Sequence, residues 1–148
     1  MKALLPIAAF MMTLGTLGSC GKKARQTTQA DSTSFPTLAD KQTFLEHYVS
    51  FRRIYEDLSF DISYLDGGNG IVPGPTEWDI RLLAKVPQAS LDEWVSGLAS
   101  TPAPDLAWVF TIPGAPSKLA SFEWYSDDAR AVGISREHRL VLYRNRSE

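Results

Sequence analysis

Cysteine and histidine are scarce in this chain: of 148 residues, one is cysteine and two are histidine. Zinc sites need three or four ligands from histidine, cysteine or carboxylate side chains, so no metal site is expected. A lone cysteine also excludes a disulfide within the chain. Stability must therefore come from packing, for which the composition of 44% hydrophobic and 11% aromatic residues suffices.

Sequence motifs for catalysis and for cofactor binding are also missing. No Gly-x-Ser-x-Gly segment is present to mark an activated serine. The glycines of residues 66–76 do not lie between a strand and a helix, which excludes a phosphate-binding loop or a dinucleotide fingerprint. The spacing of Asp66, Asn69, Asp127 and Asp128 matches no calcium-binding EF-hand loop. We therefore expect no cofactor.

An excess of positive charge is absent as well. The net charge is −2, and residues 38–148 carry 11 Lys and Arg against 16 Asp and Glu. This balance argues against a nucleic-acid partner. The acidic side chains either steer a basic partner or are neutralised within the fold, which is the simpler interpretation of five C-terminal arginines. These are Arg130, Arg136, Arg139, Arg144 and Arg146.

The one long hydrophobic run lies at the N-terminus. Lys2 is followed by residues 3–17, which are almost all apolar. The run is shorter than the roughly 20 residues that a membrane-spanning helix needs. One basic residue, a short apolar segment and small residues are typical of a secretory signal peptide. The run ends at the tetrapeptide Leu17-Gly18-Ser19-Cys20.

This tetrapeptide resembles the lipobox of bacterial lipoproteins. The resemblance implies cleavage before Cys20, a diacylglyceryl group on its sulfur and an acyl chain on its new amine. Two or three chains anchor stably, since each buried CH₂ contributes about 0.8 kcal/mol. Gly21 in place of aspartate favours the outer membrane in a Gram-negative envelope. An ordinary signal peptide is the alternative, and would leave Cys20 as a free thiol.

Three segments follow from this interpretation. Residues 1–19 form the lipoprotein signal peptide, and residues 20–37 form the lipidated cysteine with a flexible tether. The tether is polar, with Phe35 as its one large apolar residue, so it cannot bury enough surface to fold alone. Residues 38–148 form a single globular domain.

Hydrophobic periodicity predicts the elements of that domain. A helix is expected over 38–58, capped by Thr37, and a shorter helix over 87–100. Alternation and apolar runs predict strands; these cover residues 60–64, 77–86, 106–112, 119–125, 130–135 and 139–144. We expect an α+β fold: a mostly antiparallel sheet of five or six strands with both helices on one face. A β-sandwich is the alternative, which the long apolar first helix disfavours.

The connection over residues 66–76 is long for a hairpin and rich in glycine and proline. Long loops are disproportionately functional. Its apolar pair, Ile71 and Val72, lies between glycines and prolines and is expected to be exposed. We therefore predict a binding tip that includes Asp66, Asn69, Ile71 and Val72.

Three function classes remain. One of them, a lipid or small-ligand carrier, would require a cavity between the sheet and the first helix, and the many aromatic residues of that helix favour filled packing instead. The leading one is a non-enzymatic, lipid-anchored envelope protein that binds a protein or a cell-wall component, as an inhibitor, an immunity protein or an assembly accessory. The alternative is an envelope hydrolase that uses a pair of carboxylates. Its candidates lie on or beside predicted strands, and are Asp61, Glu77, Asp79, Glu123, Asp127 and Asp128.

Overall fold

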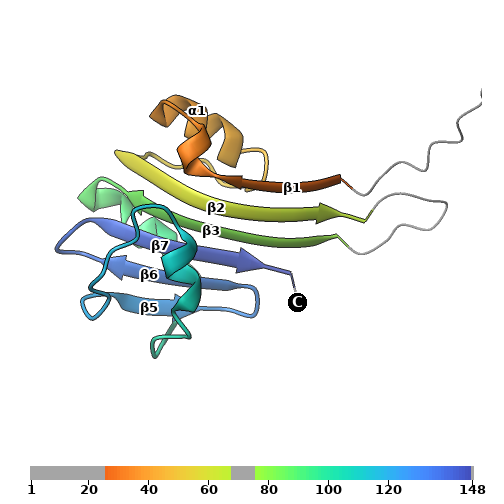
Figure 1. Cartoon of the computed structure of the whole chain (residues 1–148). Helices are drawn as coiled ribbons and strands as arrows, with labels where there is room; N and C mark the ends of the chain where they lie inside the picture. The colour runs from red at the N-terminus through yellow and green to blue at the C-terminus, as the bar shows by residue number, and fades with distance from the viewer. Residues whose placement is uncertain (1–25, 68–75, 148) are drawn as a thin grey trace, which may run out of the picture.

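The computed structural model describes residues 26–67 and 76–147 (Figure 1). Their main element is one seven-stranded antiparallel sheet, in the order β1-β2-β3-β7-β6-β5-β4. The strands are β1 (Gln26–Asp31), β2 (Asp57–Asp66), β3 (Glu77–Lys85), β4 (Ala99–Thr101), β5 (Glu123–Ser126), β6 (Arg130–Ser135) and β7 (Leu140–Arg146). The predicted α+β class with a mostly antiparallel sheet is confirmed. The count of five or six strands is wrong, because β1 and β4 extend the two edges of the sheet.

Strand β1 corrects the predicted tether. Gln26 to Asp31 pair antiparallel with residues 61–66 of β2, and the next segment is the 3₁₀ turn η1 (Ser32–Ser34). Polar composition did not prevent folding here, because an edge strand is held by backbone hydrogen bonds and needs little apolar surface of its own. The tether prediction is therefore wrong for residues 26–37. The signal peptide and Cys20 lie outside the described residues.

The first helix is shorter than predicted. Helix α1 (Leu38–Leu45) begins as expected at Thr37, whose hydroxyl accepts a hydrogen bond from the Asp40 backbone amide at 3.1 Å. It ends at Leu45, and the Glu56 amide donates to the carbonyl oxygen of Lys85 at 2.7 Å. The backbone beside Glu56 is thus already paired with the end of β3. Residues 46–56 form a turn and an irregular segment, and β2 begins at Asp57, so only the last two residues of the predicted helix belong to the sheet.

The second predicted helix and one predicted strand are 3₁₀ turns. Residues 87–100 form η2 (Gln88–Ser90), η3 (Asp92–Trp94) and then β4. Residues 106–112 form η4 (Ala107–Thr111) rather than a strand. The buried residues of this segment are Trp108, Val109 and Ile112. Their spacing fits a helical turn, and a continuous apolar run did not distinguish the two.

The two faces of the sheet are covered differently. On the packed face, Phe60, Leu82 and Tyr143 lie in register across β2, β3 and β7, within a core that also includes Leu45 and Trp94. On the other face, called the open face, η4 packs across only part of the sheet, where Trp108 and Val109 belong to a second core cluster (Figure 1). Among the described residues, no helix has both the length and the apolar character needed to cross a membrane.

Candidate functional site

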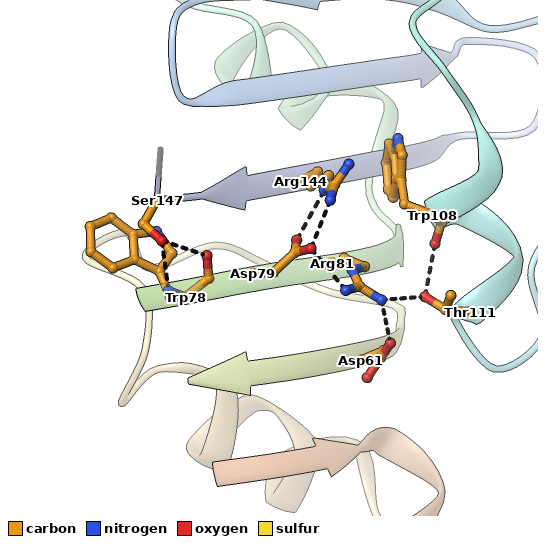
Figure 2. Close-up of polar contacts among 8 residues, drawn as sticks. All are labelled: Asp61, Trp78, Asp79, Arg81, Trp108, Thr111, Arg144 and Ser147. Carbon is orange, nitrogen blue, oxygen red and sulfur yellow. Dashed lines mark hydrogen bonds and ion pairs between the residues drawn. The ribbon is translucent and has the colours of Figure 1, made fainter. Parts of the chain in front are cut away.

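The part of the open face formed by β2 and β3 carries polar side chains. Residues 58–63 of β2 alternate between buried and half-buried positions, and residues 79–84 of β3 do the same. On these strands Asp61, Asp79 and Arg81 point to the open face, away from the apolar core (Figure 2). We call the charged surface formed by Asp61, Asp79, Arg81 and Arg144 the polar half of the open face.

Ion pairs connect the four charged side chains of the polar half. Arg81 donates from Nη1 to Oδ2 of Asp61 and from Nη2 to Oδ2 of Asp79, both at 2.8 Å. Arg144 donates from Nε and Nη2 to the two carboxylate oxygens of Asp79, at 2.9 and 2.7 Å. Sheet register explains the arrangement, since Arg81 stands directly opposite Asp61 on β2 and Arg144 on β7. The polar half is therefore a fixed array rather than a set of independent surface charges.

The turn η4 is tied to this array. Arg81 Nη1 also donates to the Thr111 hydroxyl at 3.0 Å, and that hydroxyl donates to the Trp108 carbonyl oxygen at 2.9 Å. The guanidinium carbon of Arg144 lies 5.9 Å from the centroid of the Trp108 ring, within the range of a cation–π contact. Figure 2 shows the network running from β2 to η4. The turn η4, which covers one part of the open face, thus also holds the charged side chains of the polar half in place.

The protonation of Asp79 follows from these contacts. Burial acts to raise the pKa of Asp79, but the hydrogen bonds and charges of Arg144 and Arg81 outweigh it, and the pKa lies below its ordinary value. The hydrogen bond to Asp79 in turn raises the pKa of Arg81. A general acid in a carboxylate pair needs a raised pKa. Asp79 is therefore suited to serve as a fixed anion, not as a proton donor.

The other predicted carboxylates have separate surroundings. Glu77 begins β3 and is exposed. Glu123 begins β5 and lies 3.5 Å from Nε of Arg136. Asp127 caps the turn before β6, and the hydrogen bond from the Arg130 side chain is the main cause of its lowered pKa; Asp128 follows it in the same exposed turn. The structure thus brings together Asp61 and Asp79, with the cation Arg81 between them.

A groove adjoins the polar half near the end of β7. Its volume is about 440 Å³, and we call it the polar groove. The described residues that line it are Thr27, Ser63, Leu65, Glu77, Trp78, Asp79, Arg144, Arg146 and Ser147. Ser147 is held beside Trp78, because its amide donates to the Trp78 carbonyl oxygen at 2.9 Å and its hydroxyl accepts from the Trp78 amide at 3.0 Å. Exposed Glu77 and Arg146 give the groove charges of both signs.

The predicted binding loop cannot be placed in this site. Asp66 is the last residue of β2, is exposed and lies in register with Gln26. Asn69, Ile71 and Val72 lie outside the described residues. In the part of the chain that the structure describes, no group of three or more His, Cys, Asp or Glu side chains could hold a metal ion.

Sequence reasoning missed the residues that join the strands. Arg81 was visible as a polar position on an alternating strand, but its partners on β7 and η4 were not. Thr111 and Trp108 were hidden because their segment was predicted to be a strand. The interpretation of the C-terminal arginines as neutralising charges is confirmed for Arg144 and also for Arg139, whose Nη1 lies 2.7 Å from Oε1 of Glu56.

No protein-family model, curated protein or solved structure matches this chain.

Proposed function

We propose that this protein is a lipid-anchored binding protein of the bacterial cell envelope, and that it docks a protein partner on the open face without catalysing a reaction. The observation that carries the proposal is the fixed polar half beside η4. Its four charged side chains are only 17–23% exposed and hold one another in place. A surface that is already ordered loses little side-chain entropy when a partner binds.

An aromatic side chain lies next to this surface. Phe110 of η4 is 62% exposed, and the following residue, Thr111, accepts a hydrogen bond from Arg81. Aromatic residues, phenylalanine among them, are enriched in the cores of protein interfaces relative to the rest of the surface. Phe110 is therefore our candidate anchor, and exposed Glu77 and Arg146 are candidates for charge pairing at the rim.

Lipidation of Cys20 would set the position of the domain. Strand β1 begins at Gln26, so residues 21–25 alone would separate it from the lipid. An extended chain spans at most about 3.6 Å per residue, which would hold the sheet edge within roughly 20 Å of the membrane. The expected partner is thus another component on the exported side, at the outer membrane if the envelope is Gram-negative. The tip of the 66–76 loop, with Asp66, Asn69, Ile71 and Val72, stays a candidate contact.

The anchoring step has a direct test. Cys20→Ser should leave the signal peptide uncleaved by the lipoprotein signal peptidase and should abolish labelling by a palmitate analogue. Continued labelling of the variant would rule out the lipobox interpretation.

The docking surface is tested separately, by affinity capture from the native envelope with the tagged, lipidated full chain. Phe110→Ala and Arg146→Glu should each deplete the captured partner, with the fold unchanged by circular dichroism. Ile54→Ala is the matched control, because Ile54 is an equally exposed apolar residue, at 67%, outside the open face. Equal capture by all three variants would show that the partner binds elsewhere.

A further inference from the structure

A second groove lies on the packed face, formed by the strands that also border the polar groove. Its volume is about 300 Å³, and we call it the aromatic groove. The described residues that line it are Tyr48, Val49, Ser50, Phe51, Tyr64, Trp78, Ile80, Tyr143 and Asn145. None of these side chains is charged, and five of them are aromatic. Pockets of this size that combine apolar walls with a few polar groups are typical ligand sites.

The walls are pairs of aromatic rings. Tyr48 and Tyr64 meet edge to face with centroids 5.4 Å apart, and Phe51 meets Tyr143 in the same way at 5.4 Å. Tyr64 and Trp78 are direct partners across β2 and β3, and both are half-buried. Neighbouring half-buried rings on a sheet therefore present apolar surface to the groove.

Hydrogen bonds fix the orientations of three polar groups of the groove, those of Trp78, Asn145 and Tyr143. Trp78 Nε1 donates to Oδ1 of Asn145 at 2.9 Å, and Nδ2 of Asn145 donates to the Tyr143 hydroxyl at 3.1 Å. The amide of Asn145 has two N–H groups and two lone pairs on its oxygen, so one donor and one acceptor position remain. The hydroxyls of Tyr64 and Ser50 can each donate and accept. The indole N–H of Trp78, in contrast, is already used.

This combination defines the chemistry of a ligand. The uncharged lining favours a neutral molecule. Aromatic faces attract polarised C–H groups, and the amide and hydroxyl groups suit a partner whose own groups both donate and accept. A proline-rich peptide also binds aromatic grooves, but its prolines have no N–H to donate, so it would leave the remaining acceptor position of Asn145 unpaired. A sugar ring has C–H groups on its face and hydroxyls around its edge.

We propose that the aromatic groove binds a neutral sugar ring of a glycan, stacked on Tyr64 and Trp78 and hydrogen-bonded to Asn145. This site lies on the packed face, whereas the proposed protein-docking surface lies on the open face. Trp78 lines both this groove and the polar groove, but neither proposal depends on the other.

The test uses the full-length lipidated protein in a detergent without a sugar headgroup. Two sugar probes, the β-1,4-linked trisaccharides of N-acetylglucosamine and of glucose, and a polyproline peptide are titrated separately to millimolar concentrations. Nuclear magnetic resonance follows the Trp78 indole N–H and the Asn145 side-chain amide. We expect saturable shifts of both signals with at least one sugar probe. If neither sugar probe shifts them, or if the polyproline peptide alone does so, the sugar proposal is wrong.

Two variants locate the site. Tyr64→Leu keeps apolar bulk but removes the ring, and should weaken binding about tenfold. Ser50→Trp should block the groove from an exposed position without disturbing the core, which keeps the test valid if Tyr64→Leu fails to fold. Tyr125→Leu is the matched control, because Tyr125 is another half-buried tyrosine that does not line the groove, and this variant should bind as the unmodified protein does. Unchanged affinity in Ser50→Trp would overturn the assignment.

Discussion

The two faces of the sheet are built from the same alternating strands, yet they differ in how they are stabilised. On the packed face Phe60 and Leu82 are fully buried under α1 and the segments that follow it. On the open face their neighbours Asp61 and Arg81 keep 17% and 20% of their side chains exposed and pair with each other. Charged groups that retain some water avoid most of the desolvation cost of a buried ion pair. Partial cover by η4 therefore permits a charged network beside a core.

The same contrast, between buried apolar side chains and partly exposed charged ones, occurs within the open face over a few residues. Leu142 and Arg144 point to the same face of β7, two positions apart. Leu142 is fully buried with Trp124 in the second core cluster, whereas Arg144 belongs to the polar half. The boundary coincides with Trp108, which packs in that cluster and also lies beside the Arg144 guanidinium. One tryptophan thus separates core from candidate binding surface.

The largest predicted difference between the faces concerns phenylalanine. Phe60→Ala removes a fully buried ring that stacks 5.7 Å from Phe44, and should lower the free energy of unfolding by about 3–5 kcal/mol. Phe110→Ala, on the exposed side of η4, should change it by less than about 0.5 kcal/mol. Chemical denaturation of both variants measures the contrast. Similar losses would mean that the open face is as tightly packed as the other.

A smaller loss in the free energy of unfolding is expected for a substitution in the part of the open face that η4 covers. A Cβ atom at Gly133 would lie 2.8 Å from the Trp124 ring, which is closer than non-bonded carbon atoms can approach. Gly133→Ala should therefore destabilise the protein by about 1–3 kcal/mol through overpacking. Adding Trp124→Phe should restore part of the loss, and a double-mutant cycle gives the coupling. Purely additive effects would contradict this close contact.

Asp79→Asn tests the polar half. Loss of a carboxylate that accepts three bonds from two arginines should cost about 1–2 kcal/mol at pH 7. Because its pKa is depressed in the folded state, Asp79 stabilises the fold above the unfolded pKa of about 3.9, and this stabilisation is lost as the pH falls towards the folded value. The difference in the free energy of unfolding between the unmodified protein and Asp79→Asn should shrink below about pH 4. A difference that grows on acidification would contradict the assigned ion pairs.

The smallest effect on the free energy of unfolding is expected for an ion pair that lies outside the polar half and outside both core clusters. Oε1 of Glu56 lies 2.7 Å from Nη1 of Arg139, but the two side chains are 37% and 38% exposed. Glu56→Gln should cost less than about 1 kcal/mol, and less again in high salt. Thermal unfolding at two salt concentrations measures it. A loss larger than that of Asp79→Asn would mean that cover by η4 does not strengthen the polar half.

Several local features could be predicted from the sequence. The alternation of residues 60–64 and 77–86 predicted two paired strands, now β2 and β3, and residues 130–135 coincide with β6. The Thr37 cap was predicted and is confirmed. Each of these features depends on residues that are close in sequence, because alternation and capping follow from backbone geometry over a few positions.

The candidate sites depended on residues far apart in the sequence. Asp79 meets Arg144 across 65 positions, and Trp78 meets Asn145 across 67. Which strand lies beside β3 is decided by burial and register in the whole sheet, and no local pattern specifies it.

Local sequence patterns thus specify the antiparallel character of the sheet, the start of α1 and the net negative charge of residues 38–148. Contacts between distant segments specify where α1 ends, that β1 joins the sheet, and that η4 is a turn covering one part of a face. The physical reason is that a short apolar or polar segment is compatible with several local conformations. Non-local hydrogen bonds and burial, such as the pairing of Glu56 with Lys85, select one of them.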